Sequence, residues 1–420
     1  MYKNINEIKQ KSEYCLNCKT KPCSQKGCPL ENDIPAFIEK IKQEKYEEAY
    51  KILSKTTVLP AICGRICPHE KQCQGSCVRG IKGEPVQIGN MEAFIGDKSI
   101  QENWKLEKEA DKKEKIAIVG GGPSGITAAA FLAQKGYKVT IYEKYNKLGG
   151  LLIHGIPEFR LPRDVIQNTI NKILELGIDV KYNMELGKDF TIEELEREYD
   201  AILLSFGANT SSKMNIEGEN IDGVYGGNEL LEYNLHPDYT GKKVAVIGGG
   251  NTAIDVVRTI KRKGAKSVTI IYRRARKQMP AENKEVEEAI QEGVEFLFQN
   301  NIVKIIPEEN KVSKIECIKT ELVKQEGDRE KPINIEGSNY IIDMDYVVMA
   351  LGSEPEKQVL QNLGLELNKW GYIKIDENNR TSKEKVFASG DVAGEKKTVA
   401  WAARSGRNAA EKICEYLNKK

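Results

Sequence analysis

The chain has 420 residues, too many for one hydrophobic core, so two or three domains are expected. Apolar residues make up 40% and charged residues 30%, and 64 Lys and Arg stand against 62 Asp and Glu. This balance argues against a surface that binds nucleic acid or an anionic membrane. The sequence shows no apolar run of signal-peptide or membrane-spanning type, so we expect a cytoplasmic protein.

Residues 1–112 are the first expected domain and contain eight of the ten cysteines. The first cysteine segment, "YCLNCKTKPCSQKGCP", holds Cys15, Cys18, Cys23 and Cys28, and the second, "CGRICPHEKQCQGSC", holds Cys63, Cys67, Cys73 and Cys77. In a reducing cytosol, such clustered thiols are metal ligands or redox groups more often than disulfides. Only Cys15 and Cys18 have the Cys-x-x-Cys spacing of a zinc ribbon, so zinc is disfavoured.

Between the two cysteine segments, residues 33–56 carry apolar side chains at helical spacing. The pattern predicts helical structure with Asp33 as N-cap and Pro35 in the first turn. Residues 103–115 are rich in Lys and Glu and are predicted to form a linker. A strand, glycine turn, helix and strand then follow one another twice along the chain, which indicates two nucleotide-binding units.

The first glycine turn, Gly120-x-Gly122-x-x-Gly125, directly follows the apolar residues 116–119, and Glu143 ends the next strand. In dinucleotide-binding units the glycines allow a tight turn, close approach of a pyrophosphate and close packing of the helix on the strand. An acid at the end of the second strand holds ribose hydroxyls. We therefore interpret this segment as a dinucleotide site and not as an ordinary βα turn.

The second glycine turn begins a similar unit, but its second strand ends in the basic sequence "YRRARK". A guanidinium there would bind a 2′-phosphate, which an acid would repel, so the turn is predicted to prefer NADPH. The alternative is a solvated basic edge without a ligand. The predicted NADPH contacts are Gly248, Gly250, Asn251, Thr252, Ala253, Arg273 and Arg274.

Three further segments favour FAD in the first unit. Gly149 and Gly150 in "KLGGLL" would allow close approach of a flavin, and "ASGDVAG" with "TVAWAARSGR" resembles the second FAD-contacting segment of flavoenzymes with two dinucleotide domains. In that fold the NADPH domain is inserted into the FAD domain, and "SFGAN" and "ALGSE" fit the two crossings. We expect the FAD domain at 113–209 and 353–420 and the NADPH domain at 210–352. The remaining predicted FAD contacts are Gly390, Asp391, Thr398 and Val399.

The order of these motifs, with "GGLLIHGIPEFRLPRDVI", "GGGNTAIDVVRTI" and "YRRARKQMPA", resembles the small subunit of NADPH-dependent glutamate synthase over nearly the whole chain. The N-terminal half of dihydropyrimidine dehydrogenase and the large subunit of the electron-bifurcating NADH-dependent ferredoxin:NADP oxidoreductase are also similar. The resemblance implies an α/β fold in which a helical domain with two [4Fe-4S] clusters precedes two Rossmann-like domains.

The resemblance also implies the cluster ligands, with one cysteine of the first segment crossing to the other cluster as in two-cluster ferredoxins. One cluster would be held by Cys15, Cys18, Cys23 and Cys77, and the other by Cys28, Cys67, Cys73 and Glu92. Glu92 takes the position of a glutamine ligand in the dihydropyrimidine dehydrogenase relatives. Cys63 is the alternative fourth ligand, although a free cysteine is most often a small buried residue.

The family implies that electrons pass from NADPH through FAD and the clusters to a partner subunit, expected to be the glutamate synthase large subunit. Two alternatives stay open. One is the large subunit of a bifurcating transhydrogenase, which "GIPEFRLPR" and the four-cysteine second segment fit slightly better. The other is a scaffold that keeps the fold without cofactors, against which the intact glycine turns argue. The nucleotide-binding units hold no Cys-x-x-Cys pair, so thiol–disulfide chemistry is disfavoured.

Overall fold

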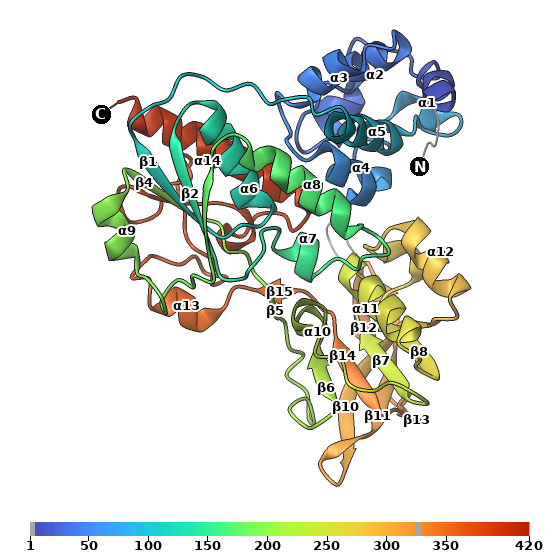
Figure 1. Ribbon diagram of the computed structural model, residues 1–420. Helices are drawn as coiled ribbons and strands as arrows, with labels where there is room; N and C mark the ends of the chain where they lie inside the picture. The colour runs from blue at the N-terminus through green and yellow to red at the C-terminus, as the bar shows by residue number, and fades with distance from the viewer. Residues whose placement is uncertain (1–4, 325–329, 420) are drawn as a thin grey trace. The chain divides into compact units, whose positions relative to one another are not determined.

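The computed structural model describes residues 5–324 and 330–419 and divides the chain into two compact units (Figure 1). The first unit runs to Ile153 and includes Glu158–Ala208 and the chain from Pro355 on. The second unit comprises His154–Pro157 and Asn209–Glu354. The chain thus leaves the first unit after Ala208 and returns to it at Pro355, so the expected insertion of one nucleotide domain into the other is confirmed.

The N-terminal part of the first unit is helical. Its helices are α1 (Ile5–Ser12), α2 (Ile34–Lys42), α3 (Tyr46–Leu53), α4 (Pro60–Ile66) and α5 (Ile88–Gln101). The side chain of Asp33 caps α2 by accepting a hydrogen bond from the backbone N–H of Ala36, as predicted. The helical pattern of residues 33–56 is divided between α2 and α3, because Glu44 adopts a left-handed conformation with φ of 58°.

Helices α4 and α5 pack with almost no space between their backbones. A Cβ atom on Gly64 would lie 2.3 Å from the backbone nitrogen of Ala93, and one on Gly96 would lie 2.2 Å from that of Ala61. Since any larger residue would separate the two helices, these glycines fix the second cysteine segment against α5. The predicted linker after α5 contains no helix.

A parallel five-stranded sheet forms the rest of the first unit, in the order β16-β4-β1-β2-β3. The strands are β1 (Lys115–Val119), β2 (Lys138–Glu143), β3 (Asp179–Tyr182), β4 (Ala201–Leu204) and β16 (Val386–Ala388). The helices are α6 (Pro123–Gln134), α7 (Leu151–His154), α8 (Arg163–Leu174), α9 (Ile192–Glu198), α13 (Lys357–Gln361) and α14 (Val399–Leu417). Helices α6 and α14 lie side by side against the sheet, and residues 201–204 of β4 are fully buried, as expected for a strand covered on both faces.

The second unit contains another parallel sheet, in the order β6-β14-β7-β8-β9. Its strands are β6 (Val224–Gly226), β7 (Lys243–Ile247), β8 (Ser267–Tyr272), β9 (Glu295–Phe298) and β14 (Tyr346–Met349), with helices α10 (Gly227–Tyr233), α11 (Asn251–Arg262) and α12 (Asn283–Gln291). An antiparallel sheet joins β10 (Asn300–Glu308), β11 (Lys311–Val323), β12 (Lys331–Asn334) and β13 (Tyr340–Asp343). The short strands β5 (Thr210–Ser211) and β15 (Ser353–Glu354) pair where the chain enters and leaves this unit.

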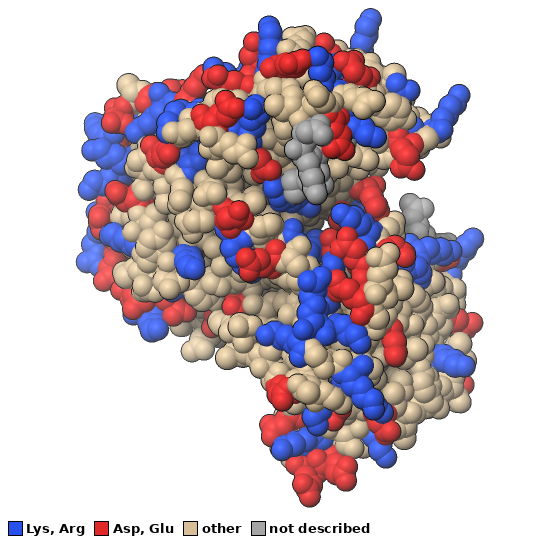
Figure 2. All heavy atoms as spheres, turned by 45° about the vertical axis from the view of Figure 1, so that its right-hand side comes forward, with Lys and Arg blue, Asp and Glu red and all other residues tan. Residues whose placement is uncertain are grey.

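The surface carries a mixture of both charge signs, as the composition led us to expect. Figure 2 shows Lys and Arg interspersed with Asp and Glu over most of the face in view. In the part of the chain that the structure describes, none of the helices has the length and apolar character needed to cross a membrane.

Candidate functional site

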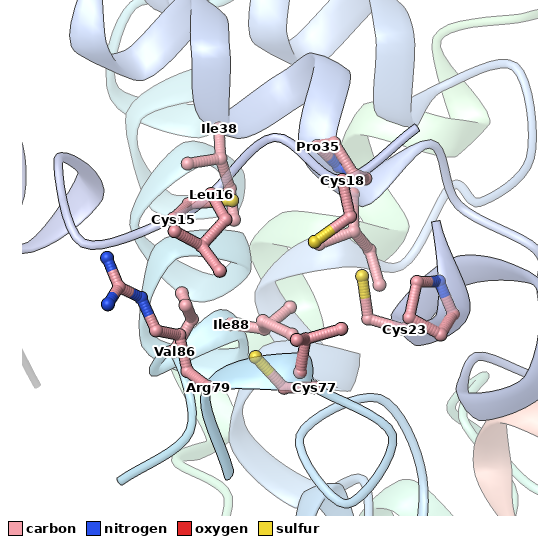
Figure 3. Close-up of a pocket in the computed structure, with 13 residues that line it drawn as sticks. Cys15, Leu16, Cys18, Cys23, Pro35, Ile38, Cys77, Arg79, Val86 and Ile88 are labelled. Atoms are coloured by element: carbon pink, nitrogen blue, oxygen red, sulfur yellow. The ribbon is translucent and has the colours of Figure 1, made fainter. Parts of the chain in front are cut away.

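The four cysteines assigned to one cluster surround a single pocket in the N-terminal helical part. Cys15, Cys18, Cys23 and Cys77 line a pocket whose other walls are mainly apolar side chains such as Ile38 (Figure 3). Burial, followed by the neighbouring Cys77 and Cys15, raises the pKa of Cys23 to about 11. Four cysteines around one apolar pocket fit, by their chemistry, the ligation of an iron–sulfur cluster.

A second group of thiols lies where α4, α5 and the loop after Cys28 meet. Burial and the nearby Glu92 carboxylate raise the pKa of Cys28 to about 12, and the same two causes, together with Cys28, raise that of Cys73. A hydrogen bond with Cys63, followed by burial, raises the pKa of Cys67 well above its usual value. The structure therefore brings together Cys28, Cys63, Cys67, Cys73 and Glu92.

Glu92 is a carboxyl group buried among these thiols. It projects from α5, is 5% exposed, and accepts a hydrogen bond from Asn32 Nδ2 at 3.1 Å. Burial raises the pKa of Glu92 to about 8, although the Asn32 amide opposes the shift. Burying a carboxylate is costly unless it is paired or bound to a metal, so Glu92 has the environment of a ligand.

The first glycine turn joins β1 to α6 in the geometry of a dinucleotide cradle. Gly120 has φ of 103°, and a Cβ on Gly125 would lie 1.9 Å from Gly120 O, so both glycines are needed for the turn itself. A Cβ on Gly122 would meet only Gly150, at 3.9 Å, so this position faces open space where a pyrophosphate can approach. Glu143, 4% exposed at the end of β2, accepts a hydrogen bond from the backbone N–H of Gly121 at 2.8 Å.

The end of β16 supplies a second wall of this cradle. Ser389 Oγ lies 2.8 Å from Ser124 Oγ at the start of α6, so the two segments are hydrogen-bonded across the sheet. Asp391 Oδ1 is buried and makes no hydrogen bond within the described residues, and burial raises the pKa of Asp391 to about 6. A buried acceptor without a donor fits a ligand hydroxyl. Thr398 caps α14, and Val399 is the first residue of that helix.

The second glycine turn, between β7 and α11, has the same division of roles. Gly248 has φ of 145°, and a Cβ there would lie 2.1 Å from Ala350 O, whereas a Cβ on Gly250 would meet no atom within 4 Å. Asn251, Thr252 and Ala253 form the first turn of α11. Arg273 and Arg274 directly follow β8, and the Nε of Arg274 is buried without a hydrogen-bond partner among the described residues. The open turn and a free guanidinium donor fit a phosphorylated nucleotide.

Three residues near the thiols have surroundings that sequence reasoning did not predict. His69 lies with its ring over α5, where a Cβ on Gly89 would come within 2.4 Å of it. Asn32 and Arg407 are buried and contact the Cys28 loop. Their signal in the sequence is weak: Asn32 precedes a helix cap, and Arg407 interrupts a helix of small residues.

The two nucleotide cradles and the thiol groups define a flavin- and NADPH-dependent oxidoreductase with an iron–sulfur domain. Residues 114–406 match the pyridine nucleotide-disulphide oxidoreductase family, and residues 1–104 match dihydropyrimidine dehydrogenase domain II, which is described as a 4Fe-4S cluster domain. The chain belongs to the pyridine nucleotide-disulphide oxidoreductase family, in the branch that includes the glutamate synthase small chain. Its cofactors are FAD, NADPH and [4Fe-4S] clusters.

Several relatives align over nearly the whole chain. The small chain of NADPH glutamate synthase from Escherichia coli K12 is 34% identical over 98% of this chain and 92% of its own length. The β subunit of the NADP⁺-dependent formate dehydrogenase of Moorella thermoacetica is 36% identical over 95% of this chain, which spans only 60% of that protein. The β subunit of the NADPH-Fe(3+) oxidoreductase of Geobacter sulfurreducens is 38% identical, and the alignment spans 54% of it.

Solved structures support the fold of the nucleotide-binding part. FprA from Mycobacterium tuberculosis matches with a TM-score of 0.66 over 73% of this chain and 85% of its own, at 20% identity. Thioredoxin reductase from T. acidophilum matches with a TM-score of 0.55, over 73% of this chain and 99% of its own, at 22% identity.

Proposed function

We propose that the chain is the electron-input subunit of a larger enzyme, in which electrons from NADPH leave through two [4Fe-4S] clusters to a glutamate synthase large subunit. That partner would convert glutamine and 2-oxoglutarate to glutamate. Bound FAD supplies the chemistry that accepts two electrons together and releases them singly. The observation that carries the proposal is that both thiol groups lie in the same compact unit as the FAD cradle.

The residues divide into three tasks. Gly122 and Gly150 leave room for the flavin nucleotide, Glu143 and Asp391 orient its hydroxyl groups, and Arg273 and Arg274 select the 2′-phosphate of NADPH. The proposed ligands of the first cluster are Cys15, Cys18, Cys23 and Cys77, and those of the second are Cys28, Cys67, Cys73 and Glu92. Cys63 packs beside Cys67 and does not bind iron.

Reconstitution with a glutamate synthase large subunit tests this proposal. The mixture is expected to form glutamate from glutamine and 2-oxoglutarate with NADPH as reductant. A Cys28→Ser variant serves as control, because it should lose glutamate formation while NADPH still reduces an artificial dye. Full glutamate formation by Cys28→Ser would show that electrons do not need the second cluster.

A second candidate acceptor is favoured by the Moorella and Geobacter relatives, which are as similar as the glutamate synthase chains but are named for other reactions. In that case the chain would serve a different complex, such as an electron-bifurcating transhydrogenase. Identification of the subunit that co-purifies with the chain separates the two. A small flavin and [2Fe-2S] subunit in place of a glutaminase-bearing one would favour the second candidate.

A further inference from the structure

One turn of α14 connects the FAD cradle to the loop that follows Cys28. On the cradle side, Ser405 Oγ accepts a hydrogen bond from the backbone N–H of Gly390 at 2.9 Å, and a Cβ on Gly406 would lie 2.1 Å from Ser124 O. On the other side, Arg404 and Arg407 point away from the cradle to the N-terminal helical part. Residues 404–407 therefore contact both the FAD cradle and the N-terminal helical part within one helical turn.

Arg407 is the more buried of the two arginines, with a side chain only 9% exposed. Its Nη1 donates hydrogen bonds to Leu30 O and to Thr56 O, both at 2.9 Å. Its ion-pair partner is Glu411, whose Oε1 lies 4.0 Å from Arg407 Nε and whose side chain is 64% exposed. Since solvent screens such a pair, Arg407 carries a buried charge that is held mainly by neutral carbonyl groups.

The loop that Arg407 holds also surrounds Cys28. The backbone N–H groups of Asn32 and Leu30 lie close enough to Cys28 to oppose the rise in its pKa that burial causes. Thr56 Oγ1 donates to Asn32 Oδ1 at 2.7 Å, and Asn32 in turn donates to Glu92. Arg407 thus binds two carbonyl groups near the second thiol group. Leu30 lies in the loop after Cys28, and Thr56 holds Asn32, which contacts Glu92.

Burying a cation next to neutral groups is unfavourable unless a negative charge lies close by. An iron–sulfur cluster with three thiolates and a carboxylate is anionic, and each added electron makes it more so. Charge and hydrogen bonds around a cluster set its reduction potential. We propose that Arg407 is a positioning residue whose buried charge raises the reduction potential of the cluster bound by Cys28, Cys67, Cys73 and Glu92.

This inference rests on the ligand assignment of the proposed function, and Arg404 provides a matched control for it. Arg404 lies on the same helical turn and donates to Pro29 O at 2.9 Å, but it is 29% exposed and its Nη2 lies 2.8 Å from Glu31 Oε1. Its charge is therefore largely compensated. Neutralising Arg404 should change the cluster potential much less than neutralising Arg407.

The test is a redox titration, followed by electron paramagnetic resonance, of the anaerobically purified chain with its flavin and clusters. Arg407→Gln is expected to lower the equilibrium constant for reducing one cluster about tenfold, which is about 59 mV for one electron. The other cluster and the flavin should keep their potentials. Arg407→Lys, which retains the charge, should stay near the wild-type potential, and Arg404→Gln should give a smaller shift.

Unchanged cluster potentials in Arg407→Gln, equal shifts of both clusters, or equal shifts in Arg407→Gln and Arg407→Lys would each overturn the inference. If Arg407→Gln loses one cluster while it keeps the flavin and the other cluster, the loss supports a charge requirement. Loss of flavin and both clusters together in Arg407→Gln and Arg407→Lys would instead indicate a purely structural role. Retention of both clusters by Cys28→Ser would contradict the ligand assignment itself. Failure of that assignment can therefore be told apart from failure of the inference about Arg407.

Discussion

Asn32 Nδ2 donates a hydrogen bond to Glu92 Oε1 at 3.1 Å, although the two residues are separated by 60 positions in the sequence. Asn32 is 1% exposed and is itself held by Thr56 Oγ1. The contact ties the loop after Cys28 to helix α5. It also fixes the position of the Glu92 carboxyl group, which is close enough to Cys28, Cys67 and Cys73 to raise their pKa values.

Removing this hydrogen bond should change one cluster and leave the other unaffected. A hydrogen bond to a ligand withdraws charge from it, so Asn32→Leu is expected to lower the reduction potential of the second cluster. A bond worth about 1 kcal/mol corresponds to roughly 40 mV for one electron. A redox titration followed by electron paramagnetic resonance measures the shift. Equal potentials in wild type and Asn32→Leu would indicate that Glu92 is not a ligand of that cluster.

Nucleotide choice is expected to depend on Arg273 and Arg274. Replacing both with Gln removes the charge opposite a 2′-phosphate, and a charge-assisted hydrogen bond is worth about 1.5–3 kcal/mol. KM for NADPH should therefore rise roughly 10- to 100-fold, while KM for NADH changes little. Arg276→Gln is the control, because Arg276 is paired with Asn283 and Glu287. Equal losses with both nucleotides would contradict the NADPH assignment.

Asp391 offers a prediction with a defined pH dependence. Because burial raises its pKa to about 6 from the usual 3.8, the folded apoprotein is destabilised when Asp391 ionises. The cost is absent below about pH 3, where both folded and unfolded forms are protonated, and it is complete above about pH 7, where both are ionised. Asp391→Asn should thus stabilise the flavin-free protein by about 2–3 kcal/mol at pH 7.5, and by almost nothing at pH 3.

The same substitution should weaken flavin binding, because a neutral amide oxygen accepts a hydrogen bond from a hydroxyl less strongly than a carboxylate does. We expect the Kd for FAD to rise about tenfold. Urea unfolding of the flavin-free protein and flavin fluorescence measure the two effects. Asp179→Asn, on the exposed strand β3, serves as control. An unchanged Kd would show that Asp391 does not contact the flavin.

The sequence predicted those features whose determinants are local. The two glycine turns could be recognised because Gly120 and Gly248 adopt positive φ angles, and a Cβ on Gly248 would overlap Ala350 O. Asp33 could be identified as a cap because its partner is three residues away. The break between α2 and α3 was missed, because it depends on a single left-handed glutamate, a residue type with no strong preference for that conformation.

The interactions that join distant segments could not be predicted. Arg407 binds Leu30 O across 377 positions and Thr56 O across 351, and no pattern in either segment indicates the other. For the same reason the sequence left Cys63 and Glu92 as alternatives. The structure places both in the second thiol group, with Cys63 hydrogen-bonded to Cys67.

The choice between Cys63 and Glu92 can be settled with two variants. Glu92 is a buried carboxyl group with a neutral partner, whereas Cys63 is a 1% exposed thiol on α4. If Glu92 is the fourth ligand, the anaerobically purified wild type should contain about eight iron atoms, as two [4Fe-4S] clusters require. Glu92→Ala should then shift or destroy one cluster while the other cluster and the flavin remain.

Cys63→Ala is the matched variant, and it should keep both clusters because Cys63 contacts the proposed ligand Cys67 but is not itself proposed to bind iron. Its expected cost is confined to protein stability, at about 1 kcal/mol for a small buried side chain. Iron analysis and low-temperature electron paramagnetic resonance on both proteins give the answer. If Cys63→Ala loses a cluster and Glu92→Ala keeps both, Cys63 is the ligand, and the buried Glu92 instead acts on the cluster from outside its coordination sphere.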